Sequence, residues 1–123
     1  MEYKVELYKS VNGLGFGTDK AEVRKIMGNF DNTTERDMFS DFFAEYEDDK
    51  LVSVEVFGDF IVEVNDVIFS SDDEFEEMER KIRQIDPDAE IDDCGAISKK
   101  YSIAAYFENG FDAFLIAKEG YYE

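Results

Sequence analysis

The sequence contains no histidine, no tryptophan, one cysteine and one proline among its 123 residues. Without histidine, catalysis by a Ser-His-Asp or Cys-His arrangement and zinc binding through histidine are excluded. Because Cys94 stands alone, the chain forms neither an intrachain disulfide nor a cysteine zinc cluster. No apolar run approaches the roughly 20 residues that span a bilayer, and the charged amino end does not resemble a secretory signal. We therefore expect a soluble, cytoplasmic protein.

Basic residues are also few. The chain has 13 bases against 31 acids, which gives a formal net charge of −18. Such a charge repels nucleic acid and anionic membranes, so we expect neither as a partner. The content of hydrophobic residues, 44%, argues against disorder and suffices for one core. We expect a single domain over residues 1–123.

Hydrophobic patterning predicts an α+β fold with a mainly antiparallel sheet and two helices. Alternation of polar and apolar residues predicts strands over 2–8, 38–46, 51–57, 60–69, 97–108 and 111–117. With one helix on either side of the three central strands, the order is β-α-βββ-α-ββ, and a short strand near Glu90 is an option. The Gly58-Asp59 pair predicts a two-residue hairpin, and Asn109-Gly110 predicts a type I′ turn.

Each helix has a predicted start, buried stripe and stop. For the first, Thr18 is the expected N-cap and Gly28 the expected end, and the buried residues are Val23, Ile26 and Met27. For the second, Ser71 to Glu74 reads as a capping box, and Asp86-Pro87 ends the helix. Its apolar stripe consists of Phe75, Met78, Ile82 and Ile85.

The two halves, residues 1–59 and 60–123, have similar patterns. Val11-Asn12 matches Val64-Asn65, and Arg24-Lys25-Ile26 matches Arg80-Lys81-Ile82. A tandem duplication of a helix-plus-meander unit explains these matches. So does chance, because amphipathic helices resemble one another by chemistry alone, and both explanations stay open.

Three features of the sequence suggest ligand or catalytic sites, but none meets the requirements of such a site. The glycines at 13, 15 and 17 fit neither the P-loop nor the dinucleotide fingerprint. Residues 86–93 carry alternating acids, but Ile91 and Ile97 stand where a calcium loop needs glycine and glutamate. Cys94 lies between Asp93 and Gly95, and the acidic residues before it disfavour its thiolate. We therefore assign no catalytic residue, no metal ligand and no cofactor, and do not expect an enzyme.

The acids concentrate in residues 72–93, which contain 11 acids and three bases. The apolar stripe of the second helix directs its acids outward, so we expect an acidic surface over this helix and the loop that follows. The net charge of −18 exceeds the magnitude of about 2–8 that keeps a small domain in solution. This excess favours a basic protein partner, with the two tyrosines near the end of the chain as aromatic anchors. A surface that only keeps the domain in solution, as in an acidic proteome, is the alternative. The candidate partner-binding residues are Asp72, Asp73, Glu76, Glu79, Asp86, Asp88, Asp92, Asp93, Tyr121 and Tyr122.

Two resemblances bear on function. Residues 15–28, GFGTDKAEVRKIMG, followed by a strand meander, resemble the helix-plus-meander unit of the β-lactamase-inhibitory-protein fold, which small outer-membrane assembly lipoproteins share. The chain has neither the signal sequence of those lipoproteins nor the cysteine that belongs to that signal, so we do not expect their membrane role. In composition and layout it resembles the small acidic immunity proteins of bacterial polymorphic toxin and contact-dependent inhibition systems. That resemblance implies a non-enzymatic inhibitor that binds a cognate toxin, often a basic nuclease.

Other functions remain open. A DNA mimic that inhibits a DNA-binding enzyme would have the same negative charge. A small enzyme or ligand-binding domain that uses carboxylates, with or without a divalent metal, would need acids that converge in a pocket. The sequence leaves the oligomeric state undetermined.

Overall fold

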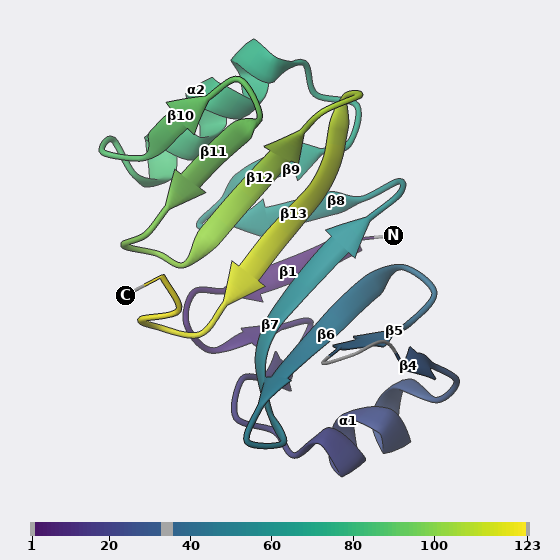
Figure 1. Cartoon of the computed structure of the whole chain (residues 1–123). Coiled ribbons are helices and arrows are strands. Elements are labelled where there is room, and N and C mark those ends of the chain that lie inside the picture. The colour runs from purple at the N-terminus through teal and green to yellow at the C-terminus, as the bar shows by residue number, and fades with distance from the viewer. Residues whose placement is uncertain (1, 33–35, 123) are drawn as a thin grey trace.

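The computed structural model describes residues 2–32 and 36–122, which form two helices and two β-sheets (Figure 1). The smaller sheet has the order β3-β2-β1-β8-β9, with β1 at Glu2–Glu6, β2 at Ser10–Val11, β3 at Leu14–Gly15, β8 at Ile61–Val64 and β9 at Val67–Ser70. The larger sheet has the order β10-β11-β12-β13-β7-β6-β5-β4. Its strands are β10 at Glu90–Asp92, β11 at Gly95–Ser98, β12 at Ile103–Phe107, β13 at Phe111–Ala117, β7 at Lys50–Phe57, β6 at Phe42–Glu47, β5 at Arg36–Met38 and β4 at Asp31–Asn32. The predicted α+β class is confirmed.

The two sheets share one hydrophobic core. Alternate residues of β1 and β8, among them Val5 and Val62, point into it from the smaller sheet. Phe114 of β13 enters from the larger sheet, and its ring centroid lies 4.8 Å from that of Phe69 in β9. Burial of these apolar side chains is what holds the sheets together.

The connection at Gly58-Asp59 differs from the prediction. It is not a hairpin turn, because β7 and β8 belong to different sheets and the chain crosses between them here. The next strand, β8, pairs in parallel with β1, with Tyr3 opposite Val62. The segment predicted as one strand over 60–69 is itself a hairpin, β8–β9, which turns at Asn65-Asp66, where both residues have positive φ, 49° and 66°.

The hairpin around Asn109-Gly110 is confirmed, but its turn type is not the predicted one. Phe107 pairs with Phe111, so the loop has three residues, and of the Asn-Gly pair only Gly110 has positive φ. The carboxylate of Asp112 orders the loop by accepting hydrogen bonds from the backbone N–H groups of residues 108 and 109, at 2.8 and 3.2 Å. A type I′ turn has two loop residues, both with positive φ, so this three-residue loop with one such residue is a different turn.

The second helix, α2 at Phe75–Ile85, buries the predicted stripe. Met78, Ile82 and Ile85 are buried, and the half-buried Phe75 packs on the core. The predicted capping box is wrong: Glu74 precedes the helix without a side-chain cap, and the Ser71 hydroxyl accepts a hydrogen bond from the backbone N–H of residue 60. The helix stops at Asp86, as expected.

The first helix, α1 at Lys20–Met27, buries much less than predicted. It follows Asp19 rather than Thr18 and ends at Gly28, whose φ of 83° suits the predicted stop. Val23 is fully buried, but Ile26 and Met27 are exposed, so the predicted stripe of three is wrong. A helix of eight residues at the end of the molecule contacts too little of the sheets to cover a full apolar face.

The order of elements is repeated along the chain. A hairpin, a helix and a four-stranded meander occur as β1–β2, α1 and β4–β7, and again as β8–β9, α2 and β10–β13. The first half has in addition the short strand β3 before its helix, whereas no strand lies between β9 and α2. The two meanders meet at β7 and β13, which pair antiparallel in the middle of the larger sheet. Duplication of an ancestral unit stays a prediction.

Gly95 has no room for a side chain. Its φ is 140°, and a Cβ atom built there would lie 1.9 Å from the carbonyl oxygen of Ala105 on the neighbouring strand. We expect Gly95→Ala to lower the free energy of unfolding by at least about 3 kcal/mol, because β11 must move away from β12. Urea denaturation measures this. Gly17→Ala is the control: φ there is 94° but the surroundings are open, so it should cost about 1 kcal/mol. Equal effects would contradict the close approach of the two strands.

Candidate functional site

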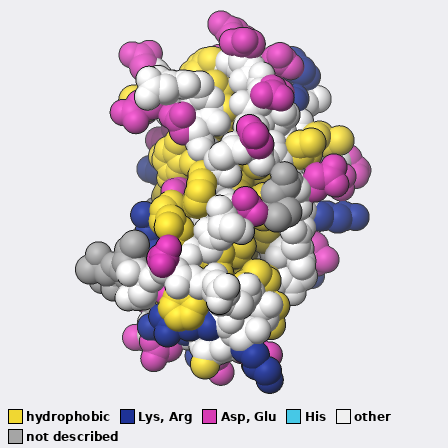
Figure 2. All heavy atoms as spheres, turned by 90° about the vertical axis from the view of Figure 1, so that its right-hand side faces the viewer, with side chains coloured by type: hydrophobic (Ala, Val, Ile, Leu, Met, Phe, Trp, Pro, Cys, Tyr) yellow, Lys and Arg dark blue, Asp and Glu magenta, His cyan; other side chains and the backbone are white. Residues whose placement is uncertain are grey.

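The surface around α2 and β10 carries a cluster of exposed carboxylates, which we call the acidic end. The core-facing stripe of α2 fixes the orientation of the helix, and the acids of its other faces point outward. Figure 2 shows carboxylates crowding the upper end of the molecule, whereas most of the visible basic side chains lie in the lower half. Among the residues that the structure describes, these carboxylates form no ion pair. They belong to Asp72, Glu74, Glu76, Glu77, Asp88, Asp92 and Asp93.

The bases within and beside this region leave its charge largely uncompensated. Lys81 is bound to Asp73, Arg83 to Glu79 at 3.4 Å, and Lys99 to Glu90 at 3.4 Å. Each of these bases neutralises an acid outside the set of seven. Arg80, the remaining base of α2, is also exposed, so the acidic end has seven carboxylates against one base of its own helix.

Asp73 does not belong to the acidic end. Its side chain is only 9% exposed, and its carboxylate accepts hydrogen bonds from Lys81 Nζ at 2.7 Å and from the backbone N–H of Ser70 at 3.0 Å. The prediction that Asp73 projects outward is thus wrong. The residue joins the start of α2 to the strand before it.

Asp86 is likewise unavailable to a partner. It is 4% exposed, and its carboxylate accepts a hydrogen bond from the Ser98 hydroxyl at 2.7 Å and one from the backbone N–H of Asp88 at 2.9 Å. These contacts close the loop between α2 and β10 and attach it to β11. Glu79 is half-buried, and its pairing with Arg83 reduces its contribution to the surface charge.

Tyr121 and Tyr122 lie on the outer face of the larger sheet, away from the acidic end. They pack against Ile97, Tyr106 and Leu115. The Tyr121 hydroxyl donates a hydrogen bond to Glu45 Oε1 at 2.5 Å; burial, followed by this bond, raises the pKa of Tyr121 to about 12. These tyrosines follow the carboxyl end of β13 and pack there. Phe75 of α2 contacts Phe107, which pairs with Phe111 at the amino end of β13, so α2 lies near the other end of this strand. The predicted site residues therefore do not form one surface.

The sequence did not single out the grooves that flank this tail. One, of about 630 Å³, lies between α1, the β6–β7 turn and Tyr121. A smaller one, of about 170 Å³, contains Glu45 and Glu55, the only two carboxylates that line it. Glu45 accepts hydrogen bonds from Tyr121 and Ser53, and Glu55 faces Arg36 at 3.7 Å. Both acids of the smaller groove are thus engaged by neighbours, although burial raises the pKa of Glu55.

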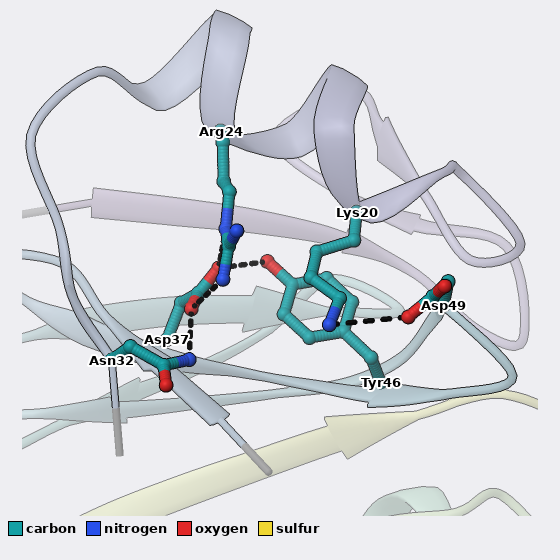
Figure 3. Close-up of polar contacts among 6 residues, drawn as sticks. All are labelled: Lys20, Arg24, Asn32, Asp37, Tyr46 and Asp49. Carbon is teal, nitrogen blue, oxygen red and sulfur yellow. Dashed lines mark hydrogen bonds and ion pairs between the residues drawn. The ribbon is translucent and has the colours of Figure 1, made fainter. Parts of the chain in front are cut away.

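A second polar cluster, centred on Asp37, lies beneath α1 (Figure 3). Asp37 is fully buried, and its carboxylate accepts hydrogen bonds from Arg24 Nε and Nη2 at 2.8 and 2.9 Å, from Asn32 at 3.0 Å and from the Tyr46 hydroxyl at 2.9 Å. Lys20 lies over the Tyr46 ring and pairs with Asp49 at 3.1 Å. With every strong acceptor position occupied, this cluster positions α1 and leaves no capacity for a ligand.

Local sequence holds no signal for this cluster, because the four groups come from α1, β4, β5 and β6 and meet only in the folded chain. Burial alone would raise the pKa of Asp37. The hydrogen bonds from Arg24, Asn32 and Tyr46, together with the Arg24 charge, outweigh burial and lower the pKa to about 2.

Within residues 2–32 and 36–122, no three acidic or cysteine side chains come together in a way that would hold a metal ion. None of the helices described has the length and apolar character to cross a membrane. No protein-family model, curated protein or solved structure matches the chain.

The pKa of Asp37 predicts a specific loss of stability in acid. Because its folded pKa lies below the ordinary value of 3.8, the ionised group stabilises the fold at neutral pH by about 2 kcal/mol. That contribution should disappear as the pH falls from about 4 through about 2. Asp37→Asn mimics the protonated acid, so it should cost about 2 kcal/mol at pH 7 and almost nothing near pH 2, as measured by urea denaturation.

Asp31→Asn is the matched control, since Asp31 is exposed on the adjacent strand β4. We expect it to change the free energy of unfolding by less than about 0.5 kcal/mol at either pH. A cost for Asp37→Asn that does not vary with pH would contradict the assigned role of the Asp37 charge.

Proposed function

We propose that the chain is a non-enzymatic protein inhibitor, an immunity protein that binds a basic cognate toxin. The observation that carries the proposal is the acidic end: seven exposed carboxylates, none in an ion pair within the described residues, gathered around one helix and the following strand. A net charge of −18 destabilises a small fold through self-repulsion. Concentrating uncompensated charge at one end is explained if a basic partner neutralises it.

The contacts that hold α2 and its flanking segments in place favour binding of a partner without a change in the backbone of the acidic end. Met78 and Ile82 anchor α2 in the core, and the Asp73–Lys81 and Asp86–Ser98 contacts hold the segments on either side of it. The carboxylates are therefore attached to a rigid frame before a partner arrives, which reduces the entropy lost on binding.

The mechanism we propose is electrostatic and steric. Long-range attraction between the acidic end and the lysines and arginines of the toxin's substrate site accelerates association. Once bound, the domain covers that site and excludes the substrate. No chemical step is required of the inhibitor, which agrees with the absence of histidine from the sequence.

Two other functions would use different features. A DNA-mimic inhibitor would present the same carboxylates to a DNA-binding enzyme, so only the identity of the partner separates it from a toxin inhibitor. A carboxylate enzyme would use Glu45 and Glu55 in the smaller groove, or Glu45 with the acids at 47, 48 and 49 in the larger one. Hydrogen bonds from Tyr121 and Ser53 already occupy Glu45, which favours the inhibitor over the enzyme.

The direct test is binding to a toxin domain. The proposal predicts that the gene directly upstream encodes a large secreted protein with a variable carboxyl-terminal domain, and that domain is the probe. We expect Asp72→Lys combined with Glu76→Lys to weaken binding by at least about tenfold, because two attractive charges become repulsive. Isothermal titration calorimetry measures the change.

The control makes the same change of charge elsewhere. Glu2→Lys combined with Glu6→Lys alters two exposed acids of β1, in the smaller sheet, and should change the affinity by less than about threefold. Equal effects of the two pairs would contradict recognition by the acidic end. Tight binding to a DNA-binding enzyme, without binding to the toxin domain, would contradict the immunity function.

A further inference from the structure

The outer face of the larger sheet has a groove of about 320 Å³ beside the acidic end. Strands β10, β11 and β12 contribute its lining, which includes the half-buried side chains of Ile97 and Tyr106. The charged residues that line it are both exposed acids, Glu90 and Asp92. This combination of apolar and acidic lining suits a side chain with an apolar stem and a positively charged end.

Gly95 opens the groove because it has no side chain. In the register of the sheet it stands between Asp92 of β10 and Tyr106 of β12, its direct partners on either side. Neighbouring strands lie about 4.8 Å apart, so the Cα atoms of Asp92 and Tyr106 are about 10 Å from each other, with no side chain between them. The close approach of β12 that excludes a side chain at Gly95 keeps this gap open. A carboxylate and an aromatic ring therefore line the same gap.

Asp92 is fixed in place and still has capacity for a ligand. Its Oδ1 atom accepts a hydrogen bond from the backbone N–H of Cys94 at 2.8 Å. A carboxylate accepts several hydrogen bonds, and within the described part of the chain no base forms an ion pair with Asp92. Glu90, two residues earlier on β10, pairs with Lys99 at 3.4 Å. Asp92 is therefore the main charge that the groove offers to a ligand.

The groove adjoins the acidic end at the start of α2. The backbone N–H of Phe107 donates a hydrogen bond to the carbonyl oxygen of Cys94 at 2.7 Å. The ring centroid of Phe107 lies 5.3 Å from that of Phe75, the first residue of α2. A partner drawn to the acids at the start of α2 can thus reach the groove with one side chain.

We propose that this groove binds one arginine side chain of the basic partner, an inference that rests on the function proposed above. The guanidinium lies between Asp92 and Tyr106, where it donates hydrogen bonds to the carboxylate and stacks on the ring. The methylene stem of the arginine covers Ile97. Lysine fits less well, because its ammonium is compact, more strongly hydrated and not flat. The arginine is then the buried centre of an interface whose other contacts are exposed charges.

An NMR titration of the full, isotope-labelled chain with N-acetyl-L-arginine amide tests the groove without the toxin. In about 0.15 M sodium chloride, which screens general attraction to the acids, we expect saturable shifts of the backbone amides of Gly95, Ile97 and Tyr106. The dissociation constant should be millimolar, because a single side chain gains little beyond the cost of its immobilisation. The lysine analogue should bind at least about threefold more weakly, and the uncharged citrulline analogue at least about tenfold more weakly.

Asp92→Asn removes the charge but keeps an oxygen for the N–H of Cys94, so the variant should fold and bind the arginine probe at least about fivefold more weakly. Glu108→Gln is the matched control, because it removes the same charge from an exposed residue just after β12 that does not line the groove. We expect it to change the affinity by less than about twofold. Shifts that spread over α2 without saturation, equal affinity for the lysine probe, or equal effects of the two substitutions would each overturn the arginine site.

The toxin domain separates this inference from the function on which it rests. In isothermal titration calorimetry, Asp92→Asn should weaken toxin binding by at least about tenfold and Glu108→Gln by less than about threefold. A toxin domain whose binding responds to Asp72→Lys with Glu76→Lys, but not to Asp92→Asn, would overturn the arginine site alone. An arginine probe that binds in the groove of a chain to which the toxin domain does not bind would contradict the immunity function and support the arginine site.

Discussion

The buried carboxylate of Asp37 is the contact on which the α1 end of the molecule depends. It joins α1, through Arg24, to β4 and β6, through Asn32 and Tyr46. Since Val23 alone of the residues of α1 is fully buried, apolar packing contributes little to the placement of this helix. The charged hydrogen bonds take over that role, and burial of Asp37 strengthens them because the surroundings are less polar than water. Ile26 and Met27 of α1 stay exposed in this arrangement, because a helix held by polar contacts need not bury its apolar side.

At the opposite end of the molecule, the acids of a chain with 31 of them are divided between buried and exposed positions. Asp73 and Asp86 are turned inward and satisfied by Lys81, Ser98 and backbone N–H groups. The remaining carboxylates of α2 and β10 project into solvent, where water screens them. The molecule thus has an acidic end around α2 and β10, opposite the end that carries α1 (Figure 1). We propose that this acidic end binds a basic toxin.

Features set by local sequence were predictable. The stripe of α2 and the hairpin at 107–111 depend on residues within one or two turns of chain, and both are confirmed. Features set by distant contacts were not. The change of sheet at Gly58 depends on the parallel pairing of β8 with β1, some 60 residues away. The same limit applies to the site, because a pattern that sorts α2 into inner and outer faces cannot show that Lys81 folds back onto Asp73.

The central claim is that the acidic end recognises a basic protein partner by electrostatic attraction. The most direct measurement is the association rate constant with the toxin domain, by stopped flow, as a function of ionic strength. Steering by the acidic end predicts a rate constant that falls steeply between about 0.05 and 0.5 M salt, and a much weaker dependence once Asp72 and Glu76 are reversed to lysine. A rate constant that is independent of salt, or equally dependent in both proteins, would contradict the claim.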